Sequence, residues 1–599
     1  HHELPSILPN CIKINPKLDD GKYPCIDLCG AGVAFKIIQA LMPNEFMKFI
    51  EFACIATVAD SVTLKDENRV IVKLGLEKIN KNPSQSLKIL MDECGVKGEV
   101  TSSTIAFIIA PRINASGRMG EALRSLTLLM EEDRESIKEL VTNINNDNAL
   151  RQKYCEEIFV DGFNKFVKTP ERRAVILKSD KWQSGLLGIV ASKLSEEFSR
   201  PTILFVESED SLRGSGRSID SINMFEMLST MNELFITFGG HAQACGLTIK
   251  KDKFEEFCNR VEKYLQNNIK AEQFIPTVKY DIDESEVPPT VELIKELNIL
   301  EPYGVGNSKP IFLRREGSMM MSSMKNFPQH LVGEGDFSEL LAFSQSKYIE
   351  VFRNEMEKAL FIDYSINSFR GSETVKGNIK DFFSIYNKEK INNDSLILSY
   401  FFNMTFNGAT KITEKQYIEL IENQDFGVLS IAETKHGLEK LKSLLDSKSY
   451  LFEANAVVVK SNINRILLSP KTSINFVKFN NIVFCEDAQA VELDGLNAET
   501  KIYTLDNNDY MDYINVKQNR ELFVKVYLEM KKLNNIIVNS YENITQNLEK
   551  VGIDSMTAMV AYAVFKELKL FSIINNRIIF AKNKKVELTD STLYTNLKI

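Results

Sequence analysis

Two adjacent histidines and one isolated aspartate are the side chains of this sequence best suited to bind a metal ion. The chain begins His1-His2-Glu3, and Asp60 closes the apolar run that starts at Phe46. Imidazoles suit ions of the Mn²⁺ and Mg²⁺ type when carboxylates supply most of the negative charge. Taken alone, the histidine pair is also typical of a purification-tag remnant, and Asp60 is equally compatible with a solvent-facing helix end.

A basic segment at residues 110–118 contains Arg112, Asn114 and Arg118, and we interpret it as a glycine-containing turn. A guanidinium group has a fixed fork of N–H donors that can hold two phosphate oxygens at once. These side chains are therefore candidate phosphate contacts. A surface loop with solvated arginines is the plain alternative.

Two glycine-rich tracts follow at residues 214–218, with Ser215 and Arg217, and at residues 238–246, with His241. Small residues let backbone N–H groups approach an anion closely, while hydroxyl and guanidinium groups add donors. Either tract alone is a weak signal for phosphate binding, and the two together are a stronger one. His241 is either a substrate contact or a histidine that packs against the Gly-Gly turn.

Apolar spacing indicates which elements position these residues. Residues 30–42 and 46–59 show helical spacing, and the charged stretch 121–166 is long enough for a helix that connects two domains. Residues 174–177 and 201–206 predict short buried strands on either side of an amphipathic helix at 187–198, which indicates an α/β unit.

Residues 278–383 consist of short alternating segments punctuated by proline and glycine, which favours a small β-barrel. An aromatic side chain in a groove of such a barrel can stack a nucleobase, which is worth roughly 1 to 3 kcal/mol. The aromatic residues are Phe312, Phe343, Tyr364 and Phe369, of which we expect half or more to be core and one or two to be available for stacking. Arg314, Arg315 and Arg370 are candidates for phosphate contact, although ordinary solvated surface is the expected role of any one of them.

Beyond residue 390 the sequence predicts strands at 427–431, 456–459 and 482–485 that alternate with helices. The chain then ends in helices and a hairpin at 571–581 that turns at Asn575-Asn576. Nothing in this part is typical of a catalytic site. We interpret its end as a winged-helix-like module that docks a partner or DNA.

The composition is that of a multidomain protein, with 599 residues, 44% hydrophobic and 26% charged. A net charge of −8 excludes overall basicity as the basis of nucleic-acid binding, which would need a local basic cleft. The 9 cysteines include no Cys-x-x-Cys pair, so a zinc knuckle is not indicated and reduced thiols of a cytoplasmic protein are expected. No apolar run is long enough for a membrane-spanning helix.

The order of these motifs resembles the RecJ family of the DHH/DHHA1 phosphoesterase superfamily. The matching runs are HHELP at 1–5, LCGAGVAFK at 28–36, TVAD at 57–60, PRINASGR at 111–118, GSGRS at 214–218, GGHAQACG at 239–246 and LEPYGVGN at 300–307. The resemblance covers most of residues 1–383. Beyond residue 390 it is weaker and points to the extra C-terminal region of Gram-positive members. One departure is Gln183, which stands where many relatives have a histidine.

The resemblance implies an α/β multidomain fold, with a DHH domain (C-terminal part) and connecting helix at residues 1–165 and a DHHA1 domain at 166–272. An oligonucleotide-binding (OB) barrel at 273–385 and a C-terminal region at 390–599 follow. In the family's Asp-His-His motif the aspartate would directly precede His1. We therefore expect the catalytic domain to be truncated at its N-terminus.

The resemblance also implies the activity of a 5′→3′ exonuclease on single-stranded DNA in DNA repair and recombination. It assigns His1, His2 and Asp60 as catalytic ligands of two Mn²⁺ or Mg²⁺ ions. The implied substrate contacts are Arg112, Asn114, Arg118, Ser215, Arg217 and His241. Single-stranded DNA is the implied partner, a single-strand-binding protein or a helicase is a candidate protein partner, and no membrane is implied.

Two other functions stay open. A chain with these two catalytic domains can be a phosphodiesterase of cyclic dinucleotides or short oligoribonucleotides, although the barrel and C-terminal region disfavour this. It can also be a catalytically inactive DNA-binding scaffold, which the retained His1, His2 and Asp60 disfavour.

Overall fold

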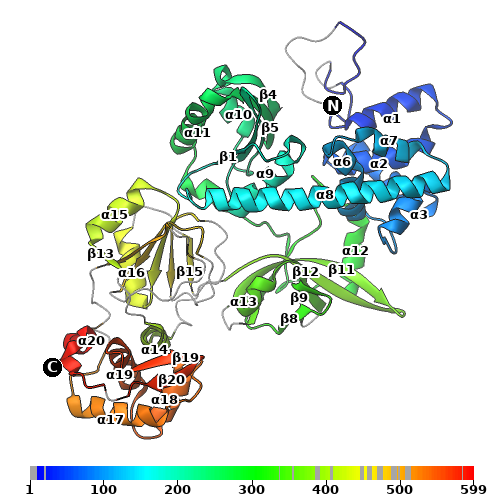
Figure 1. Ribbon diagram of the computed structural model, residues 1–599. Helices are drawn as coiled ribbons and strands as arrows, with labels where there is room; N and C mark the ends of the chain where they lie inside the picture. Colours follow the sequence, from blue (N-terminus) through cyan, green and yellow to red (C-terminus); the bar gives the residue numbers. More distant parts are fainter. Residues whose placement is uncertain are drawn as a thin grey trace.

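The computed structural model describes residues 10–18, 22–335, 338–353, 357–384, 392–404, 409–445, 451–454, 462–468, 476–486, 496, 499–505, 511, 514–582 and 584–598. A helical region is followed by sheets of five, seven and six strands and then by a helical module with a two-stranded hairpin (Figure 1). The α/β multidomain class expected from the sequence is confirmed. In the described part of the chain, no helix is long and apolar enough to cross a membrane.

The first region packs helices around one apolar core that includes Cys54, Leu87 and Val141. Its main helices are α1 (Gly30–Leu41), α2 (Ile50–Ala59), α3 (Asp66–Lys81), α4 (Gln85–Glu93), α6 (Ala110–Arg118), α7 (Ala122–Met130) and α8 (Arg134–Phe166). The expected connecting helix is present as α8, which has 33 residues and runs from this region to the five-stranded sheet (Figure 1).

The turn predicted at residues 110–118 is wrong, because this segment is helix α6. Pro111 comes just after the π-helical turn Ile105–Ile109 within a helical run from Ser102 to Arg118, and the altered hydrogen bonding of that turn accommodates a residue without a backbone N–H. Gly117 lies in the last turn and is exposed. Both residues that suggested a turn therefore occupy positions at which a helix tolerates them.

The five-stranded sheet has the order β1-β2-β3-β5-β4. Its strands are β1 (Val175–Ser179), β2 (Thr202–Glu207), β3 (Ser211–Arg217), β4 (Phe235–His241) and β5 (Ala244–Lys250). Leu204 packs in the cluster formed with α8 and α9 (Leu187–Phe198), whereas Ile203 and Phe205 pack with α10 (Met224–Ser229) and α11 (Phe254–Asn268). Because side chains alternate along a strand, α9 covers one face of the sheet and α10 and α11 cover the other.

The seven-stranded sheet surrounds a core that includes Phe312, Leu340 and Tyr364. Its order is β6 (Ile282–Asp283), β7 (Phe312–Glu316), β11 (Lys358–Phe369), β12 (Ser372–Ser384), β10 (Ser338–Ala342), β9 (Phe327–Glu334) and β8 (Met321–Met324). Helix α12 (Val291–Leu297) lies between β6 and β7 in the chain and packs against β11 and β12.

The six-stranded sheet is parallel throughout. Its order is β13 (Thr410–Ile412), β18 (Lys501–Leu505), β17 (Asn481–Phe484), β14 (Val428–Ala432), β16 (Arg465–Leu468) and β15 (Leu451–Ala454). Helices α15 (Glu414–Asn423) and α16 (Lys435–Leu444) follow β13 and β14. Strands β14 and β17 lie within one residue of the predicted ones, and the strand predicted at 456–459 lies outside the described residues.

The last module contains α14 (Asn393–Asn403), α17 (Arg520–Lys532), α18 (Tyr541–Glu549), α19 (Ser555–Glu567), the hairpin of β19 (Phe571–Ile574) and β20 (Arg577–Phe580), and α20 (Thr592–Asn596). The predicted hairpin is confirmed, and both Asn575 and Asn576 have positive φ, as a two-residue turn of type I′ requires. The winged-helix-like interpretation stays a prediction. Helix α19 is buried from Thr557 to Phe565, and α14 packs against it.

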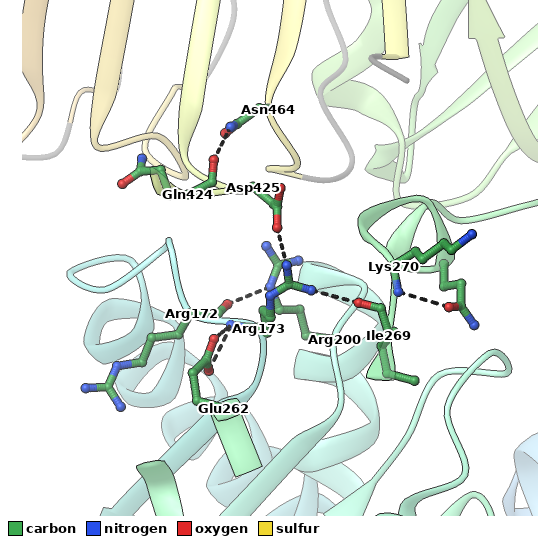
Figure 2. Close-up of polar contacts among 10 residues, drawn as sticks. Arg172, Arg173, Arg200, Glu262, Ile269, Lys270, Gln424, Asp425 and Asn464 are labelled. Atoms are coloured by element: carbon green, nitrogen blue, oxygen red, sulfur yellow. Dashed lines mark hydrogen bonds and ion pairs between the residues drawn. The ribbon is translucent and has the colours of Figure 1, made fainter. Parts of the chain in front are cut away.

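A buried polar interface joins the five-stranded and six-stranded sheets (Figure 2). The Arg173 guanidinium contacts the Asp425 carboxylate, and the Arg173 backbone N–H donates to Glu262 at 2.9 Å. Arg200 is fully buried and donates to the Arg172 carbonyl oxygen at 2.8 Å and to Asn462 Oδ1 at 2.6 Å.

Arg200 also donates to the Phe198 carbonyl oxygen at 2.8 Å and lies 3.8 Å above the Phe426 ring. Its burial lowers the pKa of the guanidinium to about 9. A buried charge of this kind is tolerated only when hydrogen bonds replace its water shell. The interface therefore holds the domain of the six-stranded sheet against the domain of the five-stranded sheet.

We expect Arg200→Ala to lower the apparent free energy of unfolding in urea by about 3 kcal/mol, because it leaves buried acceptors unpaired and a cavity behind. The control is Arg520→Ala, whose side chain is 74% exposed, and which we expect to change stability by less than about 0.5 kcal/mol. Equal effects of the two substitutions would contradict the role given to Arg200.

Candidate functional site

Asp60 lies at the C-terminal end of α2, where its backbone N–H donates to the Ala56 carbonyl oxygen at 2.9 Å and its side chain is exposed. The sequence placed it at a helix end, and the structure agrees. His1 and His2 lie outside the described residues. The described residues contain no group of three or more His, Cys, Asp and Glu side chains able to hold a metal ion. A metal centre of His1, His2 and Asp60 therefore stays a prediction, to which the described part contributes one carboxylate.

The residues predicted on α6 have different environments. Arg112 is partly buried between α6 and α8, where its Nε donates to Asn145 Oδ1 at 2.8 Å and its Nη1 donates to the Ile108 carbonyl oxygen at 2.8 Å. Asn114 is exposed. Arg118, at the end of α6, reaches across to the second domain and donates from Nη1 to the Gly185 carbonyl oxygen at 3.1 Å. The helix thus extends one of its arginines to the five-stranded domain.

Four arginines converge where α6 and α8 meet this domain: Arg112, Arg118, Arg151 and Arg217. Burial and then the charge of Arg118 lower the pKa of Arg217. Burial lowers the pKa of Arg151, and the charges of Arg118 and Arg112 lower it further. Among the described residues, none of these four guanidinium groups forms an ion pair with a carboxylate. The junction therefore carries positive charge that an anion would neutralise.

Arg151 on α8 is the member of this cluster that the sequence did not reveal. It stands in a long charged helix with no motif around it. Its Nε atom is buried and, in the described part of the chain, makes no hydrogen bond. A buried donor without an acceptor costs free energy unless a ligand or water supplies the acceptor. Arg151 is therefore identified by its buried donor and its charged neighbours, which only the folded structure shows.

The strand register places Ser215, Arg217 and His241 on one face of the five-stranded sheet. Arg217 and His241 both pair with Ala244, so they lie in the same cross-strand row, roughly 10 Å apart for a spacing of about 4.8 Å between strands. Ser215 lies in the next row of the same face, opposite Gly246. The structure thus brings together three residues that the sequence placed in two separate tracts.

Glycines shape both faces of this sheet. A Cβ on Gly214 would lie 2.6 Å from the Phe205 ring, and one on Gly216 would lie 2.5 Å from the Met224 sulfur. These two glycines therefore serve the packing of the covered face. A Cβ on Gly239 or Gly246 would meet nothing within 4 Å, so these two form the open floor of the polar face.

A cavity of about 300 Å³ lies on this open face. Its polar lining comes from Ser184, Arg213, Ser215, Thr237 and Thr248. The N-terminal end of α9 stands beside it, because a Cβ on Gly188 would lie 2.7 Å from Arg217 Nη2 and 3.1 Å from Ser215 Oγ. Backbone N–H groups at the N-terminus of a helix favour an anion. Hydroxyl, guanidinium and backbone donors thus converge beside the arginine cluster.

Most of the barrel side chains singled out in the sequence are structural. Phe312 and Tyr364 are buried in the core, in agreement with the expectation that half or more of these aromatics are core residues, and they are therefore not stacking candidates. Arg314 and Arg315 form ion pairs at 2.7 Å with Glu316 and Asp283, respectively. Arg370 has positive φ in the turn between β11 and β12. The side chain of Phe369 lies outside the described residues.

Phe343 is 48% exposed and remains a candidate stacking residue. It belongs to an aromatic group that the sequence did not reveal, in which the His330 ring lies 5.1 Å from Phe343 and 6.1 Å from Phe327. The Ser344 backbone N–H donates to His330 Nδ1 at 2.9 Å and fixes this ring. Phe327 and His330 are three residues apart, so the two-residue period of a strand could not group them.

The family model described as "DHHA1 domain" matches residues 171–267, and the one described as "RecJ OB domain" matches residues 280–381. A protein of Bacillus subtilis named single-stranded-DNA-specific exonuclease RecJ is 36% identical over 315 residues, which are 52% of this chain and 40% of that protein. The protein of the same name from Thermus thermophilus is 34% identical over 295 residues, 47% of this chain and 42% of that protein. The chain therefore spans less than half the length of these two relatives.

The crystal structure of RecJ in complex with Mg²⁺ from Thermus thermophilus superposes with a TM-score of 0.51 at 22% identity, covering 90% of this chain and 76% of that one. This likeness concerns the fold alone. The two family models match this chain one after the other, and together with its sequence similarity to the two RecJ proteins they support a RecJ-type protein.

Proposed function

We propose that the chain is part of a metal-dependent exonuclease that degrades single-stranded DNA from its 5′ end, in DNA repair and recombination in the cytoplasm. The observation that carries this proposal is the cluster of Arg112, Arg118, Arg151 and Arg217, which lies beside a hydroxyl-lined cavity and lacks carboxylate partners among the described residues. The printed name of the two relatives, single-stranded-DNA-specific exonuclease, supports it.

The arginine cluster suits a terminal phosphate better than an internal one. A phosphate monoester carries about −1.5 to −2 charges at neutral pH, whereas each internal phosphodiester carries one. Arg118, Ser215 and Arg217 are the proposed contacts of the 5′-phosphate. Arg112, Asn114 and His241 are proposed to contact the nucleotides that follow. The proposed site at the junction of the two domains is expected to take a single-strand end and not a duplex.

Asp60, together with His1 and His2, is the proposed ligand set for a pair of Mn²⁺ or Mg²⁺ ions. Such ions, when bound, supply an activated water and neutralise charge on the phosphodiester. The remaining work falls to the protein, because the arginines hold the strand end in register and the second domain closes the site on that side. A fixed end places one phosphodiester at the carboxylate of Asp60 in each cycle.

Two features favour a long single strand over a dinucleotide substrate. The aromatic group of Phe327, His330 and Phe343 offers a stacking surface on the OB domain, away from the cleavage site. The six-stranded sheet and the last module, joined to the DHHA1 domain through Arg173 and Arg200, are proposed to dock a single-strand-binding protein or a helicase.

We expect Arg217→Ala to weaken binding of a 5′-phosphorylated single strand by about 10- to 100-fold, because hydrogen bonds to a charged group are worth about 1.5 to 3 kcal/mol. Affinity for the same strand with a 5′-hydroxyl should change much less. Fluorescence anisotropy measures both. The control is Arg260→Ala, an arginine of the same domain that pairs with Glu233. Equal losses on the two strands would show that Arg217 is a general backbone contact.

We expect Asp60→Asn to abolish nearly all Mn²⁺-dependent cleavage and to leave strand binding in EDTA unchanged, because no neutral side chain replaces a carboxylate ligand. The protein assayed includes whatever residues its gene encodes before His1, and release of nucleotides from a labelled oligonucleotide is measured. Asp92→Asn, an exposed aspartate of α4, is the control. Turnover of Asp60→Asn near that of the control would remove Asp60 from the metal site. A parent protein that binds single strands but never cleaves them would favour the inactive scaffold.

A further inference from the structure

A loop at residues 300–309, which precedes strand β7 of the OB domain, is bound to the first helical region close to Asp60. The Leu64 backbone N–H donates to the Val305 carbonyl oxygen at 2.7 Å. The Ser102 hydroxyl donates to the Tyr303 carbonyl oxygen at 2.6 Å. These hydrogen bonds hold the loop beside the end of α2.

Two further contacts make this arrangement rigid. Arg69 of α3 donates to the Leu300 carbonyl oxygen at 2.6 Å and to the Glu301 carbonyl oxygen at 2.9 Å. A Cβ on Gly304 would lie 2.5 Å from Leu64 Cδ1, so the loop approaches as closely as only glycine allows. The surface between the loop and the helices is therefore preformed.

A cavity of about 280 Å³ lies between this loop, the end of α2 and the segment 102–107. It is a cleft between two domains, where ligand sites are common. The residues that define its character are Val58, Ser61, Phe107, Val305, Ser308 and Lys309. It is separate from the polar cavity of the DHHA1 sheet, with which it shares no lining residue.

Three kinds of side chain line this cavity: apolar, hydroxyl-bearing and positively charged. Phe107 is 79% exposed and, with Val305, presents an apolar surface. Ser61 and Ser308 bring hydroxyl groups, which can donate or accept a hydrogen bond. Lys309 contributes an ammonium group that pairs with Asp363 at 3.2 Å. These side chains together suit a ligand that has a flat apolar face, polar atoms along its edge and a linked anionic group.

We propose that this cavity binds one nucleobase of the single strand, with Phe107 as its stacking residue. The inference rests on the proposed function and names a subsite of it. Ser61 directly follows Asp60 in the chain, so a base held here lies beside the proposed metal ligand. Lys309, which lines the cavity and pairs with Asp363, is the proposed contact for a phosphate of the same strand. The base thereby positions the phosphodiester that Asp60 serves.

The test is a walk of single abasic nucleotides along a 5′-phosphorylated oligonucleotide, with affinity measured by fluorescence anisotropy in EDTA so that no strand is cut. When the abasic site takes the position of the base held in the cavity, the affinity of the parent chain should fall by about 5- to 150-fold. This is the loss expected when one stacked base is removed. Phe107→Ala should show a similar loss on the intact strand and no further loss at that position. Phe107→Trp should restore the position dependence.

Leu123→Ala provides the matched control, because Leu123 is 75% exposed on α7 and does not line the cavity. It should behave as the parent at every position. Two results would overturn the proposal of a base pocket. One is that Phe107→Ala binds the intact strand with the affinity of the parent, and the other is that it still loses as much affinity as the parent when the abasic site is at that position. If 5′-phosphate-dependent binding persists in that case, the proposed function stands. A parent chain that binds no single strand at all would overturn both proposals.

Discussion

The constraint on which the functional part of this molecule depends is an excess of positive charge at the junction of the first two domains. The chain has a net charge of −8, and elsewhere in the described structure arginines such as Arg173, Arg260 and Arg315 form ion pairs with carboxylates. At this junction burial lowers the pKa of Arg151 and of Arg217, the charge of Arg118 lowers both further, and among the described residues no carboxylate forms an ion pair with either group. Such an arrangement destabilises the free protein and is relieved by an anionic ligand.

Close approach of the two domains is what produces this concentration of charge. A Cβ on Gly185 would lie 2.7 Å from the Arg118 carbonyl oxygen, and one on Gly188 would lie 2.7 Å from Arg217 Nη2. Glycine at these positions lets α9 reach both the end of α6 and the open face of the sheet. The connecting helix α8 brings Arg151 to the same place and also carries the first domain to the second. The electrostatic site and the domain arrangement thus depend on the same contacts.

Local sequence predicted the elements well, and it predicted their surroundings poorly. Periodicity located α1, α9, β14 and the hairpin at Asn575-Asn576, because apolar spacing and turn residues act over short distances. The motif tracts singled out Ser215 and Arg217, but only the structure shows that the two lie on one face of a strand. Burial could not be foreseen in the same way. Phe312 is core and Phe343 is surface although both are aromatic residues of the same domain.

The residues that the sequence missed share one property, since each is defined by partners far along the chain. Arg151 matters because Arg112 and Arg118 come close to it, and Arg200 because it is sealed beneath Phe426. Phe107 is notable only because the loop at 300–309 opens a cavity beside it. Contacts of this kind arise from domain packing, which no local pattern records.

The central claim is that unneutralised charge at the junction selects the 5′-phosphate. The most direct measurement is the salt dependence of binding for two oligonucleotides that differ only in a 5′-phosphate or a 5′-hydroxyl. Because each neutralised phosphate of a single strand contributes about −0.7 to the slope of log K against log[salt], the phosphorylated strand should bind more tightly and with a slope steeper by about one such contribution or more. Equal affinities and equal slopes for the two strands would contradict the account.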